Sequence, residues 1–122
     1  FNRVVNFIMR DSYMQPHLHP GPEKIEKIHV VEGKMAVLFF DDLGVATDIT
    51  ILEPGYTEFI AVPAFTWHTY VMLSDHVISY ETMMGEYAPA TWKAFAQWAP
   101  QENTPESAPY LQSLRDAALS RM

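Results

Sequence analysis

The feature that most constrains the fold is a series of short β-branched and aromatic runs separated by turn residues, which continues to about residue 88. Runs of this length and spacing are typical of β-sandwiches and small barrels. The Glu32-Gly33 dipeptide between two runs predicts a tight hairpin turn. The pattern therefore predicts an all-β fold with about eight strands, over residues 3–9, 13–19, 26–31, 34–40, 45–52, 57–62, 67–73 and 77–83.

The composition changes near Ala88, where Ala, Gln, Glu and Pro become frequent. Residues 91–98 lie between two prolines and predict two helical turns. From 105 to 121 the apolar residues recur at helical spacing, which predicts a longer helix packed on the outside of a sheet. A chain of 122 residues fits one domain, so we expect a barrel over 3–87 and a helical tail over 88–122.

The charge balance argues against two classes of partner. Eight basic and 15 acidic residues give a net charge of −7, which disfavours nucleic acid and anionic membrane surfaces. No apolar run approaches the roughly 20 residues of a membrane span, and no segment resembles a signal peptide. The chain has no cysteine, which excludes disulfides and thiolate chemistry and fits a reducing compartment. We expect a cytoplasmic protein, although the native start could lie upstream of Phe1.

The histidines carry the strongest chemical signal. His17 and His19 form an H-x-H pair, and alternate residues of a strand point to one face, so both imidazoles can bind one metal ion. His68 follows a proline turn, and Glu26 begins a predicted strand. A fold that turns these faces inward brings His17, His19, Glu26 and His68 together. Such a ligand set suits one divalent transition metal: zinc, iron(II), manganese, nickel or copper(II).

A less specific interpretation is that the histidines are ordinary surface or hydrogen-bonded residues of a β-sandwich. We favour it for His29 and His76, because isolated polar residues are commonly exposed, and His29 has the opposite strand parity to Glu26. Glu23 competes with Glu26 for the ligand position. It follows a Pro-Gly-Pro loop, where a carboxylate can point to water, so we expect Glu23 at the rim.

Further residues could complete a pocket around the metal. Tyr70 and Met72 share a strand face with His68, so Tyr70 can place a hydroxyl near the metal or simply fill the core. Glu81 has the parity to face inward as an acid or base. The tentative catalytic residues are therefore Glu81 and Tyr70. The tentative residues of a substrate pocket are Met72, Phe65 and Glu23.

The order of these residues resembles the two sequence motifs of the cupin superfamily. The first, H-x-H followed by Glu and then Gly, is matched by His17-Leu18-His19, Glu26 and Gly33. The second, usually P-x-G-x-x-H, runs from Pro63 to His68 with Phe65 at the glycine position. A more extensive resemblance, from about residue 3 to 114, is to the WbuC family of cupin-fold metalloproteins. The stretches that carry it are 14–20, 24–26, 30–42, 63–69, 85–89 and 95–100.

The resemblance implies a small antiparallel cupin barrel (a double-stranded β-helix, or jelly roll) with a metal inside. Members of the WbuC family are often linked to surface-polysaccharide or nucleotide-sugar pathways. Phe65 in place of glycine is expected to reshape the turn before His68 and to narrow the mouth of the site.

Three functions remain open at this point. The first is an isomerase- or epimerase-like enzyme, in which the metal acts as a Lewis acid on a small oxygen-rich, sugar-related molecule, with an iron(II)-dependent dioxygenase as a variant. The second is a non-catalytic protein that binds or senses a small molecule. The third is a barrel that the metal only stabilises. We also expect a homodimer, because the apolar strand over 3–9 can extend a partner's sheet.

Overall fold

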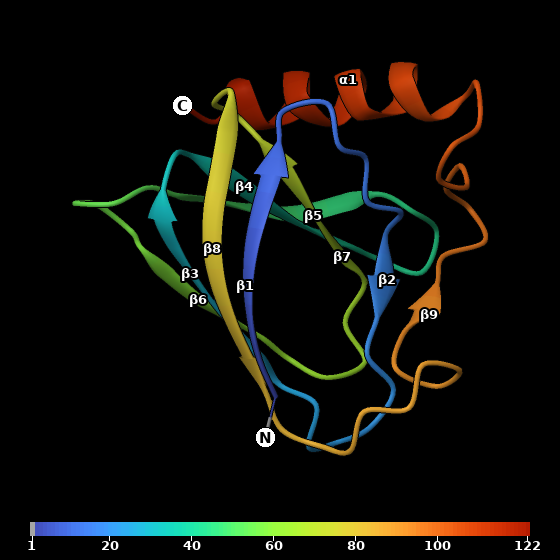
Figure 1. The fold of residues 1–122 in the computed structure, drawn as a ribbon. Helices are drawn as coiled ribbons and strands as arrows, with labels where there is room; N and C mark the ends of the chain where they lie inside the picture. Colours follow the sequence, from blue (N-terminus) through green and yellow to red (C-terminus); the bar gives the residue numbers. More distant parts are fainter. Residues whose placement is uncertain (1) are drawn as a thin grey trace.

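The computed structural model describes residues 2–122, which form two antiparallel β-sheets packed face to face and one helix (Figure 1). The first sheet has the order β1 (Asn2–Met9), β8 (His76–Met83), β3 (Glu26–Glu32) and β6 (Phe59–Val62). The second has the order β5 (Ala46–Leu52), β4 (Met35–Phe40), β7 (His68–Met72), β2 (His17–Leu18) and β9 (Ala94–Phe95). Over these residues the pairings form two separate sheets rather than one closed barrel.

Each of the eight predicted strand ranges contains a strand, so the all-β prediction is confirmed. The predicted hairpin at Glu32-Gly33 is wrong, because β3 pairs with β8 and β6 while β4 lies in the other sheet. The turn instead carries the chain between the sheets. Gly33 has a φ of 91°, and a Cβ there would collide with the carbonyl oxygen of His76. This crossing therefore requires glycine.

The main core lies between the two sheets. Along β3 the side chains alternate, with Ile28 and Val30 buried and Lys27 exposed, as expected for a strand with one face inward. The buried residues of this cluster are Ile28, Val30, Met35, Val37, Leu52, Val62, Tyr70, Met72 and Val77.

A second core holds the helix α1 (Ser107–Leu119) on the outer face of the second sheet. Leu111, Leu114 and Ala118 of α1 pack on Leu38 and Val71, which confirms the predicted docking. Arg115 is buried in this contact and donates to the carbonyl oxygens of Arg10 and Met72 at 2.7 and 3.4 Å.

The helix predicted over 91–98 is wrong: the segment contains β9 and turns. Its backbone pairs with β2 instead, and the Ala96 amide donates a hydrogen bond to the Pro16 carbonyl oxygen at 2.9 Å. Tertiary pairing has overridden a weak local preference. The chain from β8 to β9, yellow to orange in Figure 1, crosses the end of the sandwich opposite α1. Across residues 2–122, α1 is the only helix longer than a turn, and it is too short and polar to span a membrane.

Candidate metal centre

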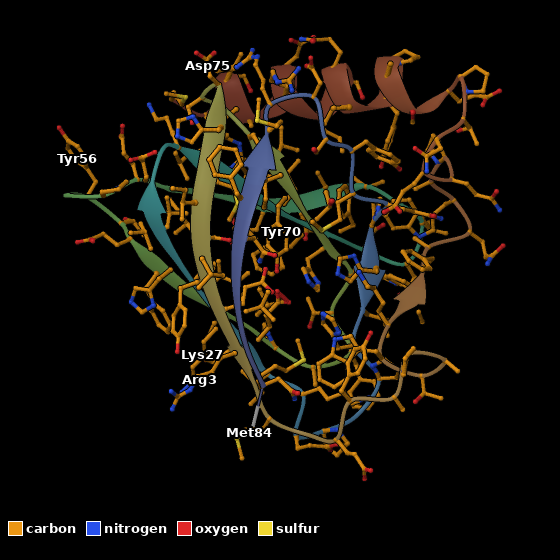
Figure 2. All side chains as sticks on the ribbon, in the orientation of Figure 1. Arg3, Lys27, Tyr56, Tyr70, Asp75 and Met84 are labelled. Carbon is orange, nitrogen blue, oxygen red and sulfur yellow. The ribbon has the colours of Figure 1, made fainter. Side chains whose placement is uncertain are left out.

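Three separate segments bring the predicted ligands together between the sheets. In β2, His17 lies directly opposite His68 of β7. His19 follows one residue after β2, and the Phe65 amide, in the turn that leads to β7, donates to its carbonyl oxygen at 3.1 Å. Glu26 begins β3 in the other sheet. Tyr70, labelled in Figure 2, lies inside the sandwich and donates a short hydrogen bond to Glu26.

Each of the three imidazoles has its Nδ1 next to a backbone carbonyl oxygen. The pairs are His17 with Gln15 at 3.0 Å, His19 with Trp92 at 2.9 Å, and His68 with Thr66 at 2.8 Å. Because a carbonyl oxygen can only accept, every Nδ1 must carry the hydrogen. In a neutral ring the Nε2 atom then offers a lone pair. Backbone hydrogen bonds that fix the tautomer in this way are characteristic of metal-binding histidines.

The three Nε2 lone pairs converge with a carboxylate. The possible ligand atoms of His17, His19 and His68 all lie within 4.8 Å of one another, and all three side chains are buried. The Glu26 Oε2 atom lies 3.1 Å from the His19 Nε2 and 3.5 Å from the His68 Nε2. The His68 Nε2 is buried without a hydrogen-bond partner. Acceptors that face one another in a buried site need a proton or a metal ion between them, so the cluster could hold a metal ion.

The charge states of the cluster suit a divalent cation. Burial, with a smaller contribution from His68, lowers the pKa of His17 to about 3, so this imidazole is neutral. Burial alone would raise the pKa of Glu26, but the contacts with His19, His68 and Tyr70 outweigh it and lower the pKa. Glu26 is therefore ionised. Burial and the neighbouring Glu26 raise the pKa of Tyr70, which keeps its proton and orients the carboxylate.

A cavity of about 310 Å³ opens beside this cluster. Of the ligand and catalytic candidates, it is lined by His17, His19, Glu26, Tyr70 and Glu81. Burial and the charge of Glu26 raise the pKa of Glu81 to about 8, so this carboxyl group carries its proton at neutral pH in the metal-free chain.

The structure does not bring the tentative pocket residues to this cavity. Met72 is buried in the core between the sheets. Glu23 lies in the 21–24 turn and is not among the lining residues. Phe65 is 57% exposed and has a φ of 59°, in the left-handed region that favours glycine. Phenylalanine therefore adopts the backbone conformation that explains the usual glycine of the motif, and its side chain does not line the cavity.

Sequence reasoning missed one wall of the cavity, which comes from the segment between β8 and β9. Tyr87, Trp92 and Lys93 of this segment line the cavity. The rings of Tyr87 and Trp92 lie 5.0 Å apart, and the Trp92 carbonyl holds the His19 imidazole. Four aromatic residues and a lysine between Gly85 and Pro100 are a signal for such a wall, but a helix over 91–98 would not have brought them to the cavity.

Comparisons with known proteins identify the type of fold. A family model described as a domain of unknown function (DUF6016) matches residues 1–52. No curated protein matches the sequence. Two of the similar solved structures are NovW, a 4-keto-6-deoxy sugar epimerase from Streptomyces spheroides, and dTDP-4-dehydrorhamnose 3,5-epimerase from Elizabethkingia anophelis.

The NovW structure is 18% identical with a TM-score of 0.66, and the match covers 98% of this chain and 69% of NovW. The second epimerase is 13% identical with a TM-score of 0.65, and the match covers 88% of this chain and 64% of that one. The capsular polysaccharide assembling protein CapF from Staphylococcus aureus is 20% identical with a TM-score of 0.66, over 76% of this chain and 26% of CapF. These are cupin-fold proteins, so the chain has a cupin-type fold.

Proposed function

We propose that the protein is a metal-binding cupin that acts on a small oxygen-rich, sugar-related molecule. The observation that carries the proposal is a cluster of three buried imidazoles, two of them next to the buried Glu26 carboxylate, beside a cavity. His17, His19, His68 and Glu26 would hold one divalent ion, and zinc, iron(II), manganese and nickel all accept such ligands. When bound, the ion supplies Lewis-acid polarisation of a carbonyl or hydroxyl oxygen.

The other cavity residues supply proton chemistry. Glu81 lines the cavity and can exchange a proton with an oxygen or carbon of the bound molecule, as an acid when protonated and as a base when ionised. The Tyr70 hydroxyl is engaged with Glu26, so we assign Tyr70 a positioning role at the carboxylate. An acid on the cavity wall supports an isomerase- or epimerase-like enzyme over a non-catalytic binding protein.

The metabolic pathway that we propose is inferred from sequence motifs and from similar solved structures. The WbuC-like motifs point to surface-polysaccharide metabolism. Two of the similar structures are sugar epimerases, and a third is a capsular polysaccharide assembling protein. We retain one domain over residues 1–122 and a cytoplasmic location as part of the proposal.

The experiment that tests this function is metal binding by the purified chain. Elemental analysis after purification without added metal should show about one transition-metal ion per chain. Titration of chelator-treated protein with zinc or manganese should raise the thermal midpoint, because the folded site binds metal better than the unfolded chain. The matched control is His29→Ala with His76→Ala, which changes histidines of the first sheet outside the cluster. An unchanged midpoint in the wild-type protein would contradict the proposal.

We also propose a homodimer formed through β1. Over the described residues, β1 is an edge strand that pairs only with β8. Val5, Phe7 and Met9 on its outer face are all more than half exposed. An edge of this kind can add to a partner's sheet. Sedimentation at micromolar concentration should show a dimer, and a 14.0 kDa monomer would contradict it.

A further inference from the structure

The cavity beside the metal centre differs in charge from the rest of the protein. The whole chain carries a net charge of −7. A divalent ion on the cluster would exceed the single negative charge of Glu26, because an imidazole that coordinates a metal is neutral. Lys93 adds the only lysine or arginine charge among the described residues that line the cavity. The loaded cavity is then net positive whether Glu81 is protonated or ionised.

The position of Lys93 allows this charge to reach a ligand. Its Nζ atom lies 5.7 Å from the centre of the Phe95 ring, which itself lies 6.2 Å from the His17 ring. Its charge adds to the lowering of the pKa of His17, behind burial and His68, and opposes part of the rise in the pKa of Glu81 that burial and Glu26 cause. Lys93 therefore lines the cavity close enough to the metal cluster for its charge to act on His17 and Glu81.

The size and the walls of the cavity limit what can bind. A volume of about 310 Å³ is at the lower end of small-molecule sites, which run from roughly 300 to 1,000 Å³. Tyr87 and Trp92 offer ring faces and edges on the wall that carries Lys93. Such a space accepts one molecule about the size of a single sugar, held by an aromatic wall, an ammonium group and the metal.

We propose that Lys93 selects ligands that carry a carboxylate, so that the cavity takes a small polyhydroxy acid in preference to the matching neutral sugar. This inference rests on the proposed function, because the metal supplies part of the positive charge. A carboxylate on Lys93 forms a charge-assisted hydrogen bond, which a hydroxyl group of a neutral sugar makes more weakly. Lys93 is thus a specificity-determining residue of the site.

The test compares matched ligands on zinc-loaded protein by isothermal titration calorimetry. The pairs are glucuronate with glucose, and gluconate with sorbitol, which differ chiefly in the carboxylate. We expect the acid of a pair to bind at least tenfold more tightly. In Lys93→Met this preference should fall by about tenfold while binding of the neutral partner changes little, and Lys93→Arg should keep the preference.

The control variant is Lys27→Met, which removes the same charge from the outer side of the first sheet, where Figure 2 labels Lys27. It should leave the preference unchanged. If Lys93→Met keeps the preference for acids, the metal alone causes that preference, and the inference is overturned. Equal binding of acids and neutral sugars to zinc-loaded wild-type protein would also overturn it while leaving metal binding intact. Absence of zinc binding would instead refute the proposed function, and this inference with it.

Discussion

The interior of the sandwich has two halves that are built from the same strands but stabilised in different ways. The inward side chains of β7 are His68, Tyr70 and Met72, and those of β3 are Glu26, Ile28 and Val30. Along each strand the first of these is polar and the last is apolar. In the apolar half, the inward side chains of β3 and β7 are buried by close packing. In the polar half, buried imidazole nitrogens face a carboxylate and need a proton or a metal ion between them.

A strand pattern with period 2 thus predicts which residues face inward, but not whether those buried side chains are stabilised by packing, by hydrogen bonds or by a bound ion. Ile28 and Glu26 are equally buried, and only the chemistry of their neighbours distinguishes core from site. The two halves should therefore respond independently to substitution. Stability should depend mainly on the apolar half, and metal affinity on the polar half.

The largest expected effect is on stability, from truncation in the apolar half. Met72 is 1% exposed in the core between the sheets. Met72→Ala should lower the free energy of unfolding by about 2–5 kcal/mol, through lost burial and a cavity. The metal stoichiometry of the folded variant should be unchanged. Chemical denaturation and elemental analysis measure both, with Leu43→Ala, which is 84% exposed in the wild type, as the control. A loss of metal with little loss of stability would contradict the separation of the two halves.

The second expected effect is a loss of zinc affinity, caused by a substitution in the polar half. Glu26→Gln keeps the shape but removes the charge that faces His19 and His68, so zinc affinity should fall by at least about 10–100-fold. Glu23→Gln is the matched control and should change zinc affinity little, because Glu23 does not line the cavity. Calorimetric titration of zinc into both variants shows whether Glu26 or Glu23 is the ligand. The reverse order of affinities would assign the ligand role to Glu23.

Much of the fold and the candidate cluster could be predicted because they depend on local rules. Strand period and turn residues located the strands, and H-x-H spacing on one strand face brought His17 and His19 together. The motif order then placed Glu26 and His68 beside them. The strand period and the H-x-H spacing are contained in short stretches of sequence, whereas the meeting of His68 and Glu26 with them is predicted from the order of the motifs and the resemblance to cupins.

The remaining features could not be predicted because they depend on tertiary contacts. Gly33 marks a turn in the sequence, but only the register of β3 with β8 shows that the turn joins two sheets. The 91–98 segment has a weak helical preference, and pairing with β2 outweighs it. Trp92 and Lys93 reach the cavity through that pairing, so a local pattern could not assign them to the site.

The smallest expected effect is a pH-dependent one at Glu81, where the two halves meet. In chelator-treated protein the pKa of Glu81 rises from 4.5 to about 8 on folding, because burial and Glu26 disfavour the charged form. The folded chain then binds this proton more tightly than the unfolded chain. Its contribution to stability is complete below about pH 4.5 and is lost as the pH rises through about 8.

Glu81→Gln cannot ionise, so it should gain stability relative to the wild-type protein as the pH rises. Thermal unfolding with chelator should show the difference in midpoint increasing between pH 5 and pH 9, on the order of 5 °C. The exposed Glu86→Gln serves as the control and should show no such trend. With zinc bound, the nearby cation favours ionised Glu81, so the difference should shrink. A difference that stays constant with pH would mean that Glu81 does not share the buried polar environment of the metal cluster.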